Sequence, residues 1–201
     1  MPAVKTHTED LASRLVDEAG RVLSAEGAAA LGLRRLATAV GTSTMAVYTL
    51  FGDKQGLLAA MYRAGYERLG AAMREAVSPG DDPLTSLANL GLAYRQAALA
   101  NPHLYDLMFG RPVPNFAPDP DDKAVADSTY EPLVDGVQRC LDDGSLVDTT
   151  GRGAARIASY LWAVSHGMVS LELAGHLDGD AAARDGAYID ALILSSAPFL
   201  P

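Results

Sequence analysis

The chain has 201 residues, enough for one domain or two small ones. Hydrophobic residues make up 49% of the sequence and charged residues 20%, so a packed core is expected and a disordered chain is excluded. The formal net charge is −9, yet residues 1–54 hold six basic and six acidic residues. This acidity argues against a protein that coats polyanions, and it leaves one small neutral surface near the N-terminus.

Neither a membrane span nor a signal peptide is expected. The longest uncharged runs, 36–52 and 157–171, are shorter than the ~18 mostly apolar residues that a span requires. The first ten residues, MPAVKTHTED, contain no apolar segment of the signal-peptide type. The single cysteine, Cys140, cannot form an intramolecular disulfide, which suits a reducing compartment. We therefore expect a cytoplasmic protein with no membrane partner.

Four helices are predicted in the N-terminal part from apolar residues at helical spacing. Thr8 is a candidate N-cap of the first helix, and Asp53 of the fourth. Thr42 or Ser43 is the candidate N-cap of the third. The predicted ranges are 8–26, 33–40, 42–51 and 54–77.

The remaining sequence also favours helices, over 84–100, 103–109, 121–142, 152–176 and 180–197. Residues 111–120 contain four prolines and are expected to form an irregular loop. No strand-like alternation persists. The predicted fold is all-α, with an N-terminal three-helix helix-turn-helix domain over 1–54 and a C-terminal helical bundle over 55–201.

The most informative segment is 33–54, LRRLATAVGTSTMAVYTLFGDK. Two short helices are joined at Gly41, and small apolar side chains such as Ala37 and Val47 allow them to cross closely, as in a helix-turn-helix. The second helix would present hydroxyl groups at its N-terminal end, where such helices enter the major groove. The same pattern also fits a packed pair of helices without any role in DNA binding.

The order of these residues resembles the TetR family of transcriptional regulators. The resemblance lies in RLATAVGTSTMAVYTLFGDKQGLLAAMY, where Tyr48 and Phe51 match a Tyr-x-x-Phe signature and Lys54 matches a phosphate-binding lysine. Thr49 and Leu50 depart from the aromatic or histidine residues that many members carry beside the tyrosine. Together, the residues and the resemblance predict a DNA-binding set of Arg34, Arg35, Thr42, Ser43, Thr44, Met45, Tyr48, Thr49 and Lys54.

The C-terminal part is similar to one subgroup of that family, which carries a Trp-x-x-x-His-Gly motif, here Trp162, His166 and Gly167. The resemblance implies that this part binds an effector and dimerises. Aromatic and other large side chains form the candidate ligand-binding set: Tyr62, Tyr66, Tyr94, Tyr105, Met108, Phe109, Trp162 and His166. Apolar stripes on the last two helices predict a dimer interface of Ile157, Leu161, Val164, Met168, Leu171, Ile189, Leu192 and Ile193.

The expected function is that of a ligand-responsive regulator, a repressor that binds palindromic double-stranded operator DNA as a homodimer. A small hydrophobic effector of unknown identity would release it by favouring a conformer that does not bind DNA. The identities of the operator and of the regulated genes do not follow from the sequence, nor does the choice between repression and activation.

Two alternatives come from other classes of protein. An enzyme is not expected, because the four histidines show no metal-ligand spacing and no nucleophile motif occurs; no cofactor and no metal are predicted. A helical interaction module that never binds DNA is the second alternative, and a test of sequence-selective DNA binding distinguishes it.

Overall fold

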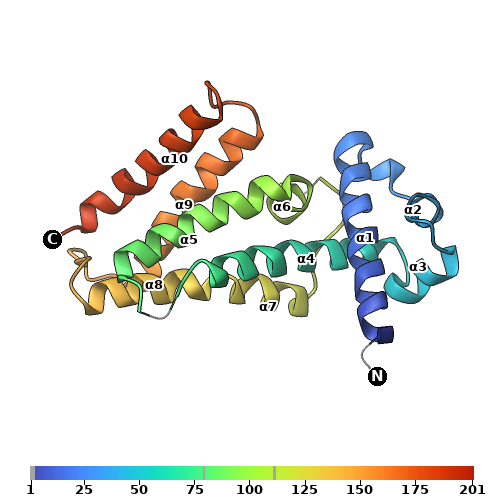
Figure 1. The fold of residues 1–201 in the computed structure, drawn as a ribbon, viewed down its shortest axis with the longest axis horizontal. Coiled ribbons are helices and arrows are strands. Elements are labelled where there is room, and N and C mark those ends of the chain that lie inside the picture. Colours follow the sequence, from blue (N-terminus) through green and yellow to red (C-terminus); the bar gives the residue numbers. More distant parts are fainter. Residues whose placement is uncertain (1–2, 79, 111) are drawn as a thin grey trace. The chain divides into compact units, whose positions relative to one another are not determined.

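The computed structural model describes residues 3–78, 80–110 and 112–201, of which residues 3–6 are described by their backbone only (Figure 1). Its described residues form α-helices and short 3-10 turns without any strand, which confirms the predicted all-α class. None of the helices described is apolar enough over sufficient length to cross a membrane.

The chain divides into two compact units, and each is described separately. The first contains residues 1–67 and 101–126, and the second contains residues 68–100 and 127–201. These units are defined by packing and do not follow the predicted functional boundary at residue 54. The division into a DNA-binding and an effector-binding domain stays a prediction.

The first unit is built around the N-terminal helices. It holds α1 (Ala3–Glu26), the 3-10 turn η1 (Ala28–Ala30), α2 (Leu33–Val40), α3 (Thr44–Phe51), the beginning of α4 (Lys54–Glu75), α6 (Pro102–Phe109) and most of α7 (Pro120–Ser128). One hydrophobic core joins the elements other than α7, since Leu15, Leu36 and Val47 share it with Leu104 and Leu107 of α6. Helix α6 is therefore part of the packing that holds α2 and α3.

The second unit is a helical bundle. Helices α5 (Pro83–Ala100), α8 (Glu131–Asp142) and α9 (Ala154–Leu173) contact one another, and α10 (Ala181–Ser196) packs on α9 and α5. The 3-10 turn η2 (Ala197–Phe199) follows α10, and the backbone N–H of Val147 donates to the carbonyl of Phe199 over 2.6 Å. The end of the chain is thereby tied to the loop before α9.

Three predictions about helix limits were wrong. Helix α1 begins at Ala3, so Thr8 lies inside it and is not its N-cap. The predicted helix 121–142 is two helices, because Pro132 has no N–H to donate and occupies the first turn of α8 instead of the middle of a longer helix. The predicted helix 152–176 is shorter, because Gly153 before its first residue has a positive φ of 78°, which lies outside the helical range.

Candidate nucleic-acid interface

The turn between α2 and α3 is built on Gly41. This residue has φ 74° and ψ 38°, a left-handed conformation that glycine adopts without steric cost. Its N–H donates to the carbonyls of Ala37 and Thr38, and the N–H of Thr42 donates to Ala37 over 2.8 Å. The last carbonyls of α2 are thus satisfied while the chain reverses toward α3.

Helix α3 begins with a side-chain cap. Ser43 is the N-cap, as one of the two predicted candidates, and its hydroxyl accepts from the N–H of Ala46 at 3.1 Å. The Arg14 guanidinium donates to the carbonyl of Val40 over 2.7 Å, which ties α1 to the end of α2. These contacts fix the start of α3 within its unit.

Helix α3 has two different sides. Val47 is 0% exposed and packs in the core, whereas Met45 is 74% exposed and Tyr48 is 48% exposed. Ser43 and Thr49 are also exposed, and Thr42 and Thr44 are partly buried. The Thr49 hydroxyl donates its hydrogen to the carbonyl of Met45 over 2.9 Å, so it can only accept a hydrogen bond from a ligand. The side of α3 away from the core therefore carries hydroxyls, one thioether and one phenol.

The predicted cationic residues differ in their partners. Arg35 forms a two-pronged pair with Glu26, with its Nη1 at 2.7 Å from Oε2 and its Nη2 on Oε1. This pairing, above all the side-chain hydrogen bond, lowers the pKa of Glu26 and raises that of Arg35. Arg34 is exposed at the start of α2. The Arg35 charge is thus balanced locally, and Arg34 remains the better candidate for attracting phosphate.

Lys54 is anchored within its own unit. Its ammonium donates to the carbonyl of Ala28, in the turn between α1 and α2, and the contact is partly buried. Asp53, immediately before it, accepts from the N–H of Gly56 over 2.9 Å and so caps α4 as predicted. Because an ammonium carries three donors, two remain for a phosphate.

The predicted ligand-binding residues fall into two groups. Tyr62, Tyr66, Tyr105, Met108 and Phe109 belong to the first unit, and Tyr94, Trp162 and His166 belong to the second. In the first unit, ring centroids lie 4.9 Å apart for Tyr62 and Tyr66, and 5.8 Å apart for Tyr66 and Phe109. Phe116, 6.1 Å from Tyr62, joins this cluster and was not predicted.

In the second unit, His166 is the centre of the other group. The Tyr94 hydroxyl and His166 Nδ1 are 3.1 Å apart, and the Trp162 ring lies 5.7 Å from the imidazole. Burial lowers the pKa of His166, which favours the neutral ring. Tyr130 contacts Trp162 at 6.0 Å and was missed, because nothing in its spacing marks it out.

The predicted dimer set also divides. Ile157 is 2% exposed and Leu161 is 8% exposed, so both fill the core of the second unit and leave almost no surface for a partner. Their assignment to the interface is corrected on this ground. Val164, Met168 and Leu192 are partly buried. The members with exposed surface are Leu171, Ile189 and Ile193, and Tyr160 on α9 is exposed as well.

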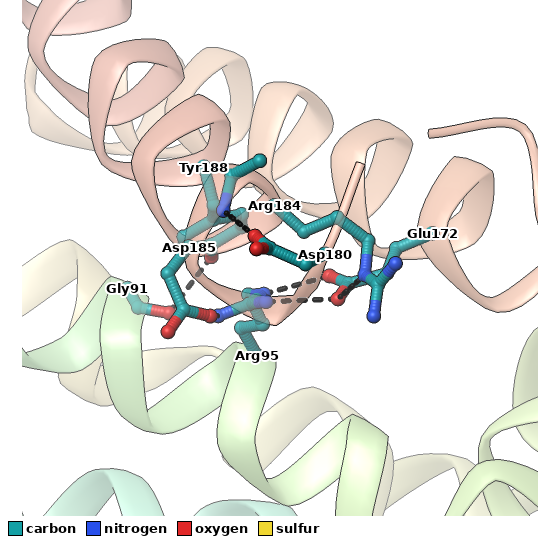
Figure 2. Close-up of polar contacts among 8 residues, drawn as sticks. Gly91, Arg95, Glu172, Asp180, Arg184, Asp185 and Tyr188 are labelled. Carbon is teal, nitrogen blue, oxygen red and sulfur yellow. Dashed lines mark hydrogen bonds and ion pairs between the residues drawn. The ribbon is translucent and has the colours of Figure 1, made fainter. Parts of the chain in front are cut away.

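A buried polar network in the second unit was not predicted at all. Arg95 of α5 contacts Glu172 of α9 and Asp185 of α10 (Figure 2). A signal was present, because Arg95 is the only charged residue in the sequence of α5. If such a charged residue is buried with its helix, it needs a partner of opposite charge.

Comparison with known proteins gives a consistent result for both parts of the chain. A family described as "Bacterial regulatory proteins, tetR family" matches residues 15–61, which include the helix-turn-helix. A family described as "Tetracyclin repressor-like, C-terminal domain" matches residues 87–194, more than half of the chain. The fold and these matches define a helix-turn-helix transcriptional regulator. The chain belongs to the TetR family.

Individual relatives agree with this assignment. The chain is similar to the HTH-type transcriptional regulator Rv1816 of Mycobacterium tuberculosis, with 26% identity over 208 residues, covering 91% of this chain and 89% of the relative. A solved structure of a Rhodococcus sp. RHA1 protein of unknown function is 29% identical, with TM-score 0.78 and coverage of 95% and 96%. PfmR of Thermus thermophilus, a TetR family regulator, shares the fold at 22% identity and TM-score 0.68, with coverage of 90% and 97%. Because these families consist of transcriptional regulators, the enzyme alternative is set aside.

Proposed function

We propose that the chain is a repressor that binds a palindromic operator as a homodimer and leaves it when a small hydrophobic effector binds. The observation that supports this most is the two-sided character of α3. Val47 anchors the helix in its unit, and Met45 and Tyr48 project from the other side beside hydroxyl groups. A helix placed in this way suits insertion into a major groove.

The proposed DNA contacts fall into two classes. Thr44, Met45 and Tyr48 would contact base edges, since hydroxyls hydrogen-bond bases and apolar groups contact the thymine methyl. Arg34 and Lys54 would contact phosphates, which position the protein without reading sequence. Residues 1–54 would thus form the DNA-binding domain.

The proposed dimer uses the exposed apolar side chains of α9 and α10. Leu171, Ile189 and Ile193 are between 44% and 57% exposed, and covering them with another surface would remove apolar area from water. A second copy is the proposed occupant, because a two-fold dimer presents two α3 helices to the two halves of a palindrome. Residues 55–201 would hold this interface and the effector site.

The proposed effector site is centred on Tyr94, Trp162 and His166 of the second unit, and the aromatic cluster of the first unit stays a separate candidate. The neutral imidazole of His166 offers a hydrogen bond without a charge, and the aromatic rings offer apolar surface, a combination that suits a hydrophobic molecule. To move the protein from mostly DNA-competent to mostly released, the effector needs a differential affinity of about 5 kcal/mol. Membership of the Trp-x-x-x-His-Gly subgroup stays part of this proposal.

Selection of bound duplexes from a random pool, with the full chain at moderate salt, tests the DNA-binding proposal. We expect enrichment of a palindrome whose half-sites lie a whole number of helical turns apart. Tyr48→Ala is expected to weaken binding to the selected duplex, and Thr44→Ala to relax selection at one position of each half-site. Thr149→Ala, an exposed threonine before α9, is the matched control. A pool without any enriched sequence would assign the chain to the class of interaction modules that do not bind DNA.

A further inference from the structure

Helix α10 is attached to its unit by few buried side chains. Of its 16 residues, Tyr188 and Ser195 are buried. Leu192 lies against Gly91 of α5, where an added Cβ would come within 3.0 Å of its methyl groups. Packing on α9 and α5 holds α10 in its unit, and polar contacts add to this packing in fixing the rotation of the helix about its own axis.

Arg95 supplies these contacts. It is 8% exposed, and its guanidinium lies between two carboxylates (Figure 2). Its Nε and Nη2 donate to both oxygens of Glu172 over 2.7 and 2.8 Å, and its Nη1 lies 2.8 Å from Asp185. The hydrogen bond to Glu172 is the main reason why the pKa of Arg95 is raised above its ordinary value. One side chain of α5 thus joins α9 to α10.

Tyr188 makes two further contacts between α10 and α5. The guanidinium carbon of Arg95 lies 5.3 Å from the centre of the Tyr188 ring, and the Tyr188 hydroxyl donates to the carbonyl of Gly91 over 2.7 Å. Asp185 and Tyr188 are three residues apart, so they lie on the same side of α10. With this side fixed toward α5, the direction of every other side chain on α10 is also fixed.

Ile189 borders the side that carries Asp185 and Tyr188, and Ile193 lies further round the same helix. Each residue of an α-helix is turned by about 100° from the one before it, so Ile189 is turned about 100° from Tyr188 but only about 40° from Asp185, four residues before it. Ile193 is one turn further and is 57% exposed. Without the contacts of Arg95, a small rotation of α10 about its axis would turn both isoleucines together, and they would face a different direction relative to the rest of the unit.

We propose that Arg95 is a positioning residue of the subunit interface, which holds Asp185 and Tyr188 so that Ile189 and Ile193 face a second copy of the chain. This inference rests on the proposed homodimer. It gives the ionic contacts of the buried Arg95 side chain, which is remote in sequence from α3, a role in pairing the two DNA-reading helices.

Sedimentation equilibrium of the full chain tests the proposal through the dimer dissociation constant. Arg95→Gln removes the ionic contacts of α5 with Glu172 and Asp185, whereas the Arg184–Glu172 pair at 3.5 Å and the Tyr188–Gly91 hydrogen bond remain. Asp185→Asn is the cleaner change, because it leaves Arg95 paired with Glu172 and removes only the carboxylate on α10. Because the Asp185 carboxylate is 60% exposed and its ion pair is screened by solvent, we expect a roughly threefold to fivefold weaker dimer for Asp185→Asn. Asp178→Asn, an exposed aspartate outside the network, is the matched control and is expected to stay within about twofold of the wild type.

A double-mutant cycle separates positioning from general stability. If Asp185 acts through the isoleucine side of α10, Asp185→Asn has little further effect in an Ile193→Ala background, whereas independent effects add. Additive losses, or an unchanged dimer constant in a folded Asp185→Asn protein, would overturn the inference and leave the proposed function intact. A wild-type chain that stays monomeric at all concentrations would instead refute the proposed dimer, and this inference with it.

Discussion

The two adjacent arginines at the start of α2 are expected to contribute differently to DNA binding. Arg35 is paired with Glu26 through two hydrogen bonds, whereas Arg34 is exposed. Only a cation whose charge is not already balanced releases a counterion when it neutralises a phosphate. We therefore predict that Arg34→Gln reduces the salt dependence of operator binding. Removal of the Arg35–Glu26 pair by the double substitution Arg35→Gln and Glu26→Gln, which keeps the net charge constant, should leave the salt dependence nearly unchanged.

The expected magnitude follows from the slope of log affinity against log salt. Each phosphate contact contributes about −0.9 to this slope, so loss of one contact in each subunit of a dimer changes it by about 1.8. Between roughly 50 and 200 mM salt the concentration rises about fourfold. Over this range the operator affinity of the wild type should therefore fall by roughly 12 times more than that of Arg34→Gln.

Fluorescence anisotropy of a labelled operator duplex, titrated at several salt concentrations over this range, measures the slope for each protein. Circular dichroism checks that all variants are equally folded. The reasoning is refuted if the pair-removal variant lowers the slope as much as Arg34→Gln, because Arg35 would then leave Glu26 to contact a phosphate in the complex.

Three further predictions concern stability and reactivity. Val47→Ala removes apolar surface from a fully buried side chain and should lower the free energy of unfolding by about 2 kcal/mol in urea titrations; a change below a few tenths would contradict its place in the core. Burial raises the pKa of the Cys140 thiol, so a thiol reagent at neutral pH should modify it only once urea unfolds the chain, and equal rates in both states would contradict its burial. Because burial lowers the pKa of His166, the unfolded chain binds its proton more readily, and stability should fall as the pH decreases below the ordinary value of 6.5. His166→Gln should flatten that decline, and an unchanged pH dependence would show that His166 does not cause it.

The helix-turn-helix was accessible from sequence because its determinants are local. Gly41 is needed for the left-handed turn, Ser43 for the cap, and Ala37 and Val47 for close packing, and all lie within eleven consecutive residues. The determinant of the break before α8 is equally local, since Pro132 has no N–H to donate and cannot continue a helix from the preceding turn.

The orientation of the last two helices could not be derived in this way. Helix α9 is apolar on more than one side, and periodicity does not say which side is buried within the chain, so Ile157 and Leu161 were assigned to a partner although they fill the core. The contacts of Arg95 join residues 77 and 90 positions apart. Such pairings depend on the tertiary arrangement, and a charged residue considered alone is more often at the surface.

The first unit is assembled from two stretches of chain that are separated by 33 residues of the other unit, 68–100. Leu104, Leu107 and Val113 complete the core that contains Val47, although they come more than fifty positions later. During translation, the N-terminal helices therefore leave the ribosome before the last part of their hydrophobic core is available, and an early nascent chain exposes the apolar surface that α6 later covers. The core around α3 is consequently completed only after the intervening residues 68–100 of the other unit have been made.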